Sequence, residues 1–544
     1  MKRKLCFIMA TAMVVTGLAG CGSADKTPKE EGPTPSATTP AKAEILPWDK
    51  APKVTVVKQN TFDVALGKTG DNIVDNPYTR YIHEKTGIRL EIVPAPSTTN
   101  EFHQVLAVKV AGGEQIDLIS WSDLSQSWID SGTTIQIDSI MEKNKALIPN
   151  ILKTIPKDAW EPAEKIDVST GKTVRYGIPT RNTLGKPMAT ALYLRKDWLD
   201  KLNLSMPKTT DDLTKVLKAF TENDPDGNGK KDTSGLFTSK GFTMTNTLMQ
   251  LWGVDTWRED WVGEKLIPSA HTDKARAAYK TLSVWYKNNY IDVEGVTDGK
   301  VSETKLLNGK IGGYVGPLAT ITKYWDQMDA AGQKDAKWAM VNTQLISSFD
   351  NKPYYFRENL NKDAIVQFCA TSKESNYPNI LKLLDWMHSE EGTTFTSYGL
   401  EGREHKVENG KKVRNMQYIN VDQKGYLNAY QFARSYATVF DDIFLSDYVT
   451  ANSKELAKAY FDASTKGTAL SWKAVDIKFA YPALETFKTY PDYRKGIETY
   501  MGKFALGELD VNDDKVWAKY LEDSDKYGFQ KILDEALPLW KNRK

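Results

Sequence analysis

The sequence predicts an α/β fold built from two αβ lobes, and three observations support this class. The 544 residues exceed what one hydrophobic core covers, so at least two lobes are expected. Strand-like runs alternate with amphipathic helical stretches over residues 54–119, which is typical of a parallel sheet covered by helices. A second stretch of this kind begins near Tyr193. The predicted lobes comprise residues 51–185 with about 360–405, and about 190–355 with 420–544.

The first lobe opens with a β-α-β-α-β pattern. Strands are predicted at residues 54–57, 90–93 and 116–119, with helices over 76–87 and 100–110 between them. Asn76-Pro77 is typical of a helix start and Gly87 of a helix end. Ligands of such sheets bind beyond the carboxyl ends of the strands. Trp121, close behind the third strand, is therefore a candidate ligand contact, with burial in the core as the alternative.

The second lobe continues with a helix that begins within residues 206–213, with a Thr cap, and has an apolar face. A strand at residues 365–370 returns the chain to the first lobe and contains Cys369, which we expect to be a free thiol in the core. Further helices are predicted over residues 377–388, 481–500 and 516–540. The chain would cross between the lobes near residues 180–192, 350–362 and 400–425, and several crossings predict a hinge and a closing cleft.

The N-terminus has the pattern of a secretory signal. Lys2-Arg3-Lys4 precedes an apolar stretch and the run Leu18-Ala19-Gly20-Cys21, so residues 1–20 are predicted to be removed. The apolar stretch is shorter than the roughly 20 residues that a membrane-spanning helix needs. Residues 21–50 are rich in Pro, Thr, Ser and Lys and are predicted to form a tether. The net charge of +2 becomes −1 when the signal leaves, and nothing favours nucleic acid as a partner.

Residues 224–232 have the spacing of a calcium-binding loop. Asp224, Asp226, Asn228 and Asp232 place side-chain oxygens at loop positions 1, 3, 5 and 9, and Lys230 offers its carbonyl. Position 12 is Gly235 instead of the usual bidentate Glu, so we expect an isolated loop in which Ca²⁺ braces the fold. A solvated turn without metal is the alternative.

Aromatic residues are abundant, with 15 Trp, and sugars present CH faces that stack on such rings. Trp252 and Trp257 belong to a cluster interleaved with charged residues. Tyr314 follows Gly312-Gly313, where missing side chains would let a ligand approach the backbone. Arg403 could pair with a sugar carboxylate, with a salt bridge inside the protein as the alternative. These four residues and Trp121 are the predicted ligand contacts.

The mature chain resembles the extracellular solute-binding lipoproteins of bacterial ABC importers. The resemblance covers the lipobox-like run at Cys21 and, in this order, residues 193–202, 206–209, 224–232, 308–314 and 398–402. It is similar in particular to oligosaccharide-binding members, among them alginate-binding proteins and large lipoproteins of firmicutes. The resemblance implies a type II periplasmic-binding-protein fold, with two αβ lobes, a hinge and an interlobe cleft that holds an oligosaccharide.

Further expectations follow from this resemblance. Cys21 would carry a diacylglyceryl group, and its new amine an acyl chain such as palmitate, which anchors the protein on the extracellular face of the cytoplasmic membrane. The expected partner is an ABC permease that receives the sugar, the calcium of the 224–232 loop would be structural, and we expect a monomer. The identity, length and charge of the sugar stay open.

Two other functions remain as alternatives. A surface glycosidase needs two carboxylates, and 70 acidic residues always offer some pair. However, the chain lacks His-Glu-x-x-His, Gly-x-Ser-x-Gly and Walker A sequences, and its five His residues do not stand at metal-ligand spacing. We therefore expect no enzyme. A lipoprotein that presents sugar to a membrane receptor instead of a permease is the second alternative.

Overall fold

The computed structural model describes residues 45–541 except 61–62, 97, 122–123, 168–169, 171, 181–189, 357–363, 416–426, 436–449, 466–476, 478–480 and 482–483. The predicted signal peptide, Cys21 and most of the predicted tether lie outside this range. The same holds for much of the three predicted crossings between the lobes. These predictions therefore stay untested.

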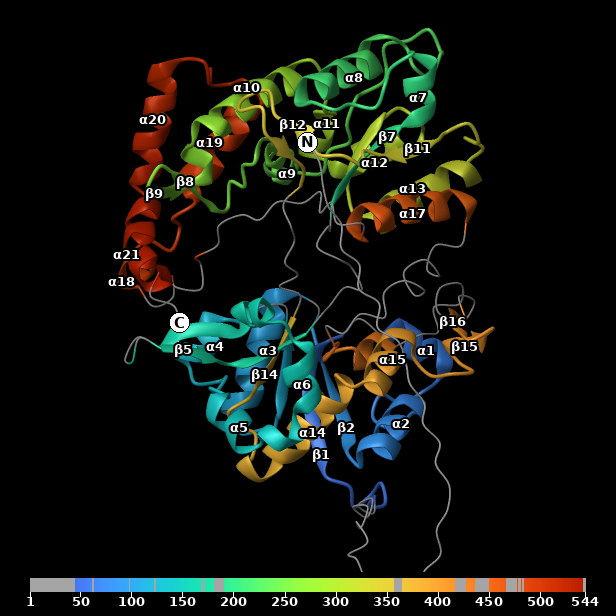
Figure 1. Cartoon of the computed structure of the whole chain (residues 1–544), viewed down its shortest axis with the longest axis vertical. Helices are drawn as coiled ribbons and strands as arrows, with labels where there is room; N and C mark the ends of the chain where they lie inside the picture. Colours follow the sequence, from blue (N-terminus) through green and yellow to red (C-terminus); the bar gives the residue numbers. More distant parts are fainter. Residues whose placement is uncertain are drawn as a thin grey trace, which may run out of the picture. The chain divides into compact units, whose positions relative to one another are not determined.

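The first lobe is built on a five-stranded sheet of order β2-β1-β3-β14-β6 (Figure 1). Its strands are β1 (Lys53–Gln59), β2 (Arg89–Ala95), β3 (Leu118–Trp121), β14 (Ala364–Phe368) and β6 (Gly177–Thr180). β1 is parallel to β2 and β3, while β14 is antiparallel to both β3 and β6. The three predicted strands of the opening pattern and the return of the chain near residue 365 are confirmed.

Local signals explain the helices that cover this sheet. In α2 (Pro77–Thr86) the Asn76 side chain accepts from the Thr79 backbone N–H and the Thr79 hydroxyl accepts from the Asn76 backbone N–H. Gly87 ends the helix at φ 73°, a left-handed conformation that suits glycine. The other long helices of this lobe are α3 (Thr99–Ala111), α14 (Tyr377–Met387) and α15 (Glu390–Tyr398). Cys369 is a buried free thiol, as predicted.

The second lobe contains the three-stranded sheet β10-β7-β11. Its central strand β7 (Ala191–Arg195) is antiparallel to β10 (Gly313–Gly316) and β11 (Trp338–Met340). In α8 (Thr210–Glu222) the Thr209 hydroxyl accepts from the Asp212 N–H, which confirms the predicted helix start. The surrounding helices are α7 (Lys196–Lys201), α9 (Thr243–Met249), α10 (Asp273–Lys287), α11 (Glu294–Thr297), α12 (Gly299–Leu307), α13 (Leu318–Ala330), α17 (Ala451–Thr465) and α19 (Lys495–Ala505).

Short elements complete the fold. Four two-stranded hairpins occur in the described part: β4 (Glu164–Asp167) with β5 (Lys172–Arg175), β8 (Glu259–Val262) with β9 (Lys265–Pro268), β12 (Leu345–Ile346) with β13 (Pro353–Tyr354), and β15 (His405–Glu408) with β16 (Lys411–Arg414). The short helices are α1 (Asp63–Thr69), α4 (Gln126–Asp130), α5 (Asp138–Lys143), α6 (Pro149–Thr154) and the 3₁₀ turns Lys145–Leu147, Lys157–Ala163, Gln250–Trp252, Ser269–His271, Glu374–Asn376 and Leu427–Tyr430.

The two long helices predicted near the C-terminus are each interrupted. The first prediction, residues 481–500, corresponds to α18 (Glu485–Thr489) and α19, which are separated around Pro491 because a proline disfavours helix at the preceding residue. The second, residues 516–540, corresponds to α20 (Asp514–Asp525) and α21 (Phe529–Lys541), with Gly528 at φ 76° between them. These continuous-helix predictions are therefore wrong at the turns.

One predicted lobe boundary is also wrong. Residues 427–433 were assigned to the second lobe, but Leu427, Tyr430 and Phe432 are buried in the core around the first sheet. The hydroxyl of Tyr430 donates to the Ile73 carbonyl at 2.9 Å, which ties this segment to the region before α2. Burial of three large apolar side chains outweighs proximity in sequence to the C-terminal helices.

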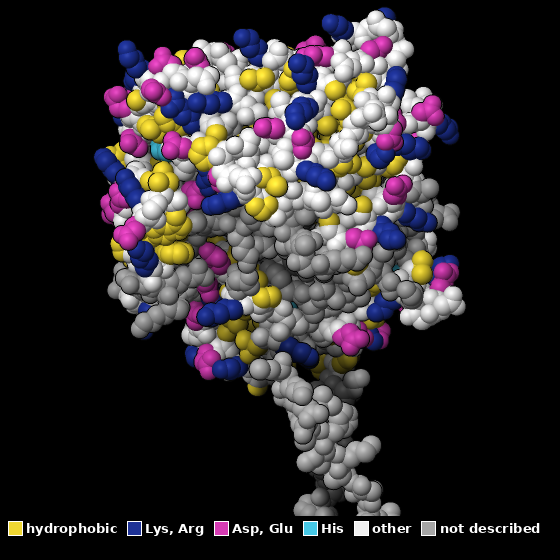
Figure 2. All heavy atoms as spheres, turned by 45° about the horizontal axis from the view of Figure 1, so that its top comes forward, with side chains coloured by type: hydrophobic (Ala, Val, Ile, Leu, Met, Phe, Trp, Pro, Cys, Tyr) yellow, Lys and Arg dark blue, Asp and Glu magenta, His cyan; other side chains and the backbone are white. Residues whose placement is uncertain are grey.

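No helix within the described ranges is long and apolar enough to cross a bilayer. On the face shown in Figure 2, Lys and Arg side chains are interspersed with Asp and Glu over the coloured surface. Such mixing is what the near-zero net charge predicts.

Candidate functional site

The ends of five strands form one edge of the first sheet. In the strand register, Lys58 of β1 stands opposite Pro94 of β2 and Ser120 of β3. Because β14 and β6 alternate in direction, the pair Ala364 and Thr180 lies at the same edge. We call these five positions the carboxyl edge. Ligands of open α/β sheets bind beyond this edge, so it is the place where a site is expected.

Lys58 places a cation at the carboxyl edge. Its side chain is partly buried, and no hydrogen bond or ion pair of its ammonium occurs in the part of the chain that the structure describes. Burial, and to a lesser extent the positive charge of Arg434, lower the pKa of Lys58 to about 8.

Arg434 reaches the same edge from a distant part of the chain. Its backbone N–H donates to the Thr180 hydroxyl at 2.5 Å, which fixes the residue beside the end of β6. The preceding Phe432 and Ala433 are buried in the core of the first lobe and hold the segment in place. Two like charges thus act on each other at one sheet edge. Neither residue was predicted as a site residue. A lysine directly after the apolar run at residues 54–57, still within the strand, is the signal that could have indicated Lys58.

Trp121 lies where the sequence predicted it, at the carboxyl end of β3, where it pairs with Ile365 of β14. Its side chain lies outside the described part of the structure. Its role as a ligand contact therefore stays a prediction.

Trp252 and Tyr314 belong to the core of the second lobe, so their prediction as ligand contacts is corrected. Trp252 is 1% exposed and packs on Trp285 with ring centroids 5.9 Å apart. Tyr314 is 5% exposed and packs on Phe237 at 5.5 Å. Rings of this size stabilise a core by the apolar area they bury, and this outweighs any surface role.

The glycines before Tyr314 make room for protein side chains and not for a ligand. A Cβ on Gly312 would come within 2.7 Å of the Trp198 ring, and one on Gly313 within 2.6 Å of Leu236. Both distances are below van der Waals contact, so the close packing of the core requires glycine here.

Trp257 is partly buried against the same core. The guanidinium of Arg494 lies over its ring at 5.5 Å from the centroid, and the Asp255 carboxylate accepts from its backbone N–H. A cation already covers one face of this ring. Its role as a sugar contact stays a prediction.

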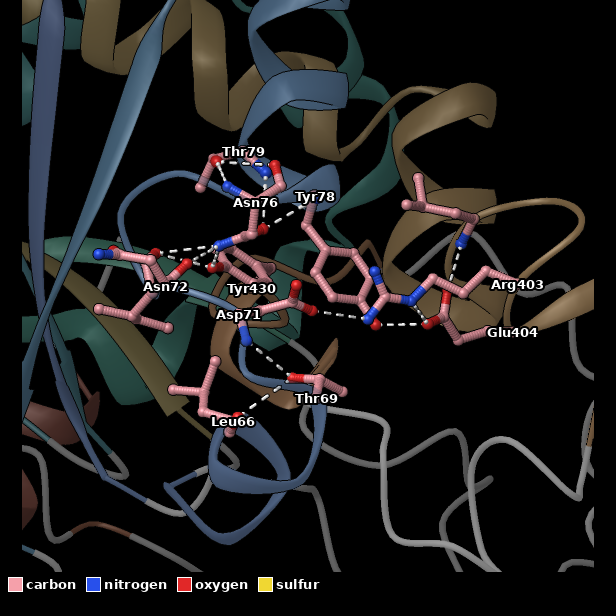
Figure 3. A network of polar contacts seen from close by, with 12 residues as sticks. Leu66, Thr69, Asp71, Asn72, Asn76, Tyr78, Thr79, Arg403, Glu404 and Tyr430 are labelled. Atoms are coloured by element: carbon pink, nitrogen blue, oxygen red, sulfur yellow. Dashed lines mark hydrogen bonds and ion pairs between the residues drawn. The ribbon is translucent and has the colours of Figure 1, made fainter.

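Arg403 lies in a network of polar side chains in the first lobe (Figure 3). Its guanidinium contacts the Asp71 carboxylate at 3.2 Å and the Glu404 carboxylate at 3.1 Å, and it lies over the Tyr78 ring at 4.9 Å. These two carboxylates balance the charge of Arg403. The structure therefore favours the salt bridge that was the alternative, and corrects the prediction of a sugar carboxylate as its partner.

Glu404 is the centre of this network, and its side chain is fully buried. It accepts from the Tyr78 hydroxyl and from the Leu400 backbone N–H. Burial raises the pKa of Glu404 above its ordinary value, while the hydrogen bonds and Arg403 act in the opposite direction. The network ties the turn before β15 to α2 and gives it a fixed place.

The predicted calcium loop forms a compact turn in which its own groups are paired. The Asp224 carboxylate accepts from the backbone N–H groups of Gly227, Asn228 and Gly229. The Asn228 amide nitrogen donates to Asp226 at 2.8 Å and to Asp232 at 3.1 Å. The Asn228 amide nitrogen thus occupies the space between the Asp226 and Asp232 carboxylates, while the Asn228 oxygen accepts from the Lys230 backbone N–H.

Lys310 supplies a cation to this loop from outside it. Its ammonium lies 2.6 Å from an Asp226 oxygen and 2.9 Å from an Asp232 oxygen. Burial opposes the charge of Lys310, but the two carboxylates outweigh this effect and raise its pKa. No group of three His, Cys, Asp or Glu within the described residues is arranged to hold a metal ion. The donor types fit Ca²⁺, with Lys310 and the Asn228 amide as competitors, and bound calcium stays a prediction.

A pocket of about 470 Å³ opens on the first lobe between α2, α15 and the β15–β16 hairpin. Rings and charges mix in its wall, which includes Arg80, Tyr81, Phe395, Glu401, His405 and Lys412. None of these residues belongs to the carboxyl edge.

The comparison with known families decides the class. Residues 71–394, more than half of the chain, match the model of the bacterial extracellular solute-binding protein family. The chain belongs to this family. The resemblance inferred from the sequence is thereby confirmed at the level of the family.

Three relatives show similarity over parts of their length. A polygalacturonan/rhamnogalacturonan-binding protein, YtcQ of Bacillus subtilis, is 30% identical over 42% of this chain and 45% of its own. The lipoprotein LipO of the same organism is 26% identical over 62% of this chain and 65% of its own. The fructooligosaccharide ABC transporter substrate-binding protein FusA of Streptococcus pneumoniae is 33% identical over 23% of this chain and 22% of its own. Each match covers less than two thirds of the relative.

Solved structures share the fold along nearly the whole chain. The alginate-binding protein AlgQ2 without calcium ion has a TM-score of 0.64 at 19% identity and covers 91% of this chain and 99% of its own. An extracellular solute-binding protein of Bifidobacterium longum subsp. infantis has a TM-score of 0.66 at 15% identity and covers 91% and 98%. The predicted two-lobe α/β fold of periplasmic-binding-protein type is confirmed.

Proposed function

We propose that this protein is the substrate-binding component of an ABC transporter, which captures an oligosaccharide and delivers it to a membrane permease. The observation that carries the proposal is the match of residues 71–394 to the solute-binding family. The polygalacturonan/rhamnogalacturonan-binding protein YtcQ and the fructooligosaccharide-binding protein FusA are relatives of this chain, which supports a sugar as the ligand.

The ligand would bind at the carboxyl edge of the first sheet. The ends of β1, β2 and β3 lie side by side there, and Trp121 is the last residue of β3. Closure of the second lobe over this edge would hold the sugar until it is released to the permease. No chemical step is required, so we propose binding without catalysis.

Isothermal titration calorimetry against a panel of neutral and acidic plant and algal oligosaccharides tests this function. We expect saturable binding of at least one of them and no cleavage products on prolonged incubation. Enzymatic hydrolysis of a panel member contradicts the binding-only function. Loss of uptake of the bound sugar after deletion of the gene distinguishes import from presentation to a receptor.

We further propose that Cys21 is lipidated after removal of residues 1–20 and anchors the protein outside the cytoplasmic membrane. The name of the related lipoprotein LipO supports this. Metabolic labelling with radioactive palmitate should mark the protein, and Cys21→Ala should abolish the label. If the wild-type protein is released into the medium without the label, the lipid anchor is contradicted.

We also propose that the 224–232 loop binds a structural Ca²⁺ through Asp224, Asp226, Asn228, Asp232 and the Lys230 carbonyl. The spacing of these oxygen donors along the loop supports it, as does the closeness of the Asp226 and Asp232 carboxylates, which share the Asn228 amide nitrogen. A chelator should lower the melting temperature, and this effect should vanish in Asp226→Ala but persist in the matched Asp211→Ala, which alters an acid outside the loop. An unchanged melting temperature on chelation contradicts bound metal.

A further inference from the structure

We propose that the ligand carries negative charge, as the carboxylate of an acidic sugar does, and that Lys58 and Arg434 bind this charge at the carboxyl edge. The proposal rests on the proposed function, because it names the class of oligosaccharide that the same site takes.

The placement of the two cations carries the first step. Lys58 is the penultimate residue of β1 and has a strand on either side, so it stands within the edge and not at its periphery. Arg434 is fixed beside the end of β6 by the Thr180 hydroxyl. Three strand spacings, about 14 Å, separate these two strands. Lys58 and Arg434 thus stand at the same edge of one sheet, on either side of the ends of β3 and β14.

The charge balance carries the second step. Elsewhere in the described structure, comparable cations have acidic partners: Lys53 at the other end of β1 contacts Glu91 at 3.1 Å, and Arg403 contacts two carboxylates. The Lys58 ammonium has burial and a second cation against it instead. A partly desolvated charge of this kind costs stability, and such costs persist at sites where a ligand completes the interaction.

The chemistry of the two groups selects the ligand. A guanidinium binds a carboxylate through two parallel N–H···O hydrogen bonds, and an ammonium adds a point charge with three donors. Uronic acids present such a carboxylate on a sugar ring. A sulfate ester presents similar anionic oxygens, so the experiment compares both.

Calorimetry on the purified protein tests the proposal with four sets of probes. These are oligosaccharides of galacturonate and of mannuronate, the methyl esters of both, neutral galactose oligosaccharides of the same length, and sulfated galactose oligosaccharides. We expect at least one uronate to bind about tenfold or more tightly than its methyl ester and the neutral sugars, because one charge-assisted hydrogen bond accounts for such a ratio. Preference for the sulfated probes overturns the carboxylate assignment.

Two variants locate the charge. Lys58→Gln and Arg434→Gln should each lower the affinity for the preferred uronate about tenfold and leave the affinity for its methyl ester nearly unchanged. Lys53→Gln is the matched control, since it removes a lysine from the same strand at the opposite end and should leave the uronate affinity unchanged. The melting temperature of Lys58→Gln should stay constant or rise, whereas a lysine that only braces the fold would lower it when replaced.

The failures are distinguishable. Binding of neutral oligosaccharides, with an unchanged affinity in Lys58→Gln, overturns the role of charge and leaves the proposed sugar-binding function intact. Equal losses for the uronate and its methyl ester in both variants overturn the assignment of the carboxylate to these residues. No binding of any probe or of the wider panel overturns both proposals.

Discussion

Lys58 in the first lobe and Lys310 in the second are both partly enclosed lysines, but their surroundings are opposite. Lys310 lies within 2.9 Å of the carboxylates of Asp226 and Asp232, which raise its pKa. Lys58 has burial and Arg434 against its charge, and its pKa falls to about 8. Lys310 therefore neutralises carboxylates of a loop of the protein itself. Lys58 has no hydrogen bond or ion pair within the described residues, and this is the contrast on which the proposed ligand role of Lys58 rests.

The largest expected loss of stability concerns the network of Arg403, a cation that is paired with carboxylates as Lys310 is. Glu404→Ala should lower the free energy of unfolding by about 3 kcal/mol, because it removes a buried acceptor of Tyr78, Leu400 and Arg403. Urea denaturation measures this loss. Glu401→Ala is the control, since Glu401 is an exposed acid of the same turn. A loss below about 1 kcal/mol in Glu404→Ala would mean that the network contributes little.

Lys310→Met should lower the stability of the protein in chelator by about 1–2 kcal/mol, because Asp226 and Asp232 then repel each other. Added Ca²⁺ should restore more stability in this variant than in the wild type, since the competing ammonium is gone. Thermal melts with and without Ca²⁺ measure both effects. Lys215→Met, which removes an exposed lysine near Asp212, is the control. If Lys310→Met and Lys215→Met respond equally to chelator, Lys310 does not stabilise the loop through Asp226 and Asp232, and the contrast drawn with Lys58 is wrong.

Lys58→Gln should change the stability of the protein in the opposite direction to Lys310→Met. The variant should be as stable as the wild type or more stable by up to about 1 kcal/mol, because it removes a charge that burial and Arg434 oppose. Denaturation in urea at pH 7 measures this. A clear loss of stability would show that Lys58 stabilises the fold through a partner within the protein, as Lys310 does.

The smallest expected effect is a difference in pH dependence. The folded-state pKa of Lys58 lies near 8 and its ordinary value is 10.5, so the unfolded chain binds more protons between these pH values. The contribution of Lys58 to stability therefore rises with pH from about 8 to 10.5. For Lys310 the folded-state pKa is raised, so its contribution is complete below 10.5 and is lost above that pH. The difference in melting temperature between wild type and Lys58→Gln should therefore shrink as the pH rises through this range, and curves that stay parallel would contradict the shift.

Much of the fold was predictable because its signals are local. The Asn76 and Thr209 helix starts and the Gly87 helix end depend on hydrogen bonds and backbone angles within four residues. The turns near Pro491 and at Gly528 were equally local, and the predicted helices there were too long because periodicity was followed across them. The calcium-type loop was found because all its donors lie within nine residues.

The candidate site was less predictable, because it depends on which face a side chain takes. The aromatic cluster indicated a sugar site, but Trp252 and Tyr314 pack in the core, where their apolar area is removed from water. Arg403 finds Asp71 and Glu404, and only the packing of α2 against the turn before β15 brings Asp71 and Arg403 together. Spacing along the chain contains no information on such partners.

By itself, the sequence determined the family, the two-lobe α/β class, four of the five strands of the first sheet and the ends of several helices. The strands and helix ends follow from hydrophobic periodicity and from short-range backbone geometry, which neighbouring residues set, whereas the family was recognised by resemblance to known sequences. Only the tertiary structure decided which charges are neutralised. Lys310 lies 84 residues from Asp226 in sequence and contacts it, whereas Lys58 is joined at its sheet edge by Arg434 from the far end of the first lobe. Electrostatic energy depends on distance in space, and that distance exists only in the folded chain.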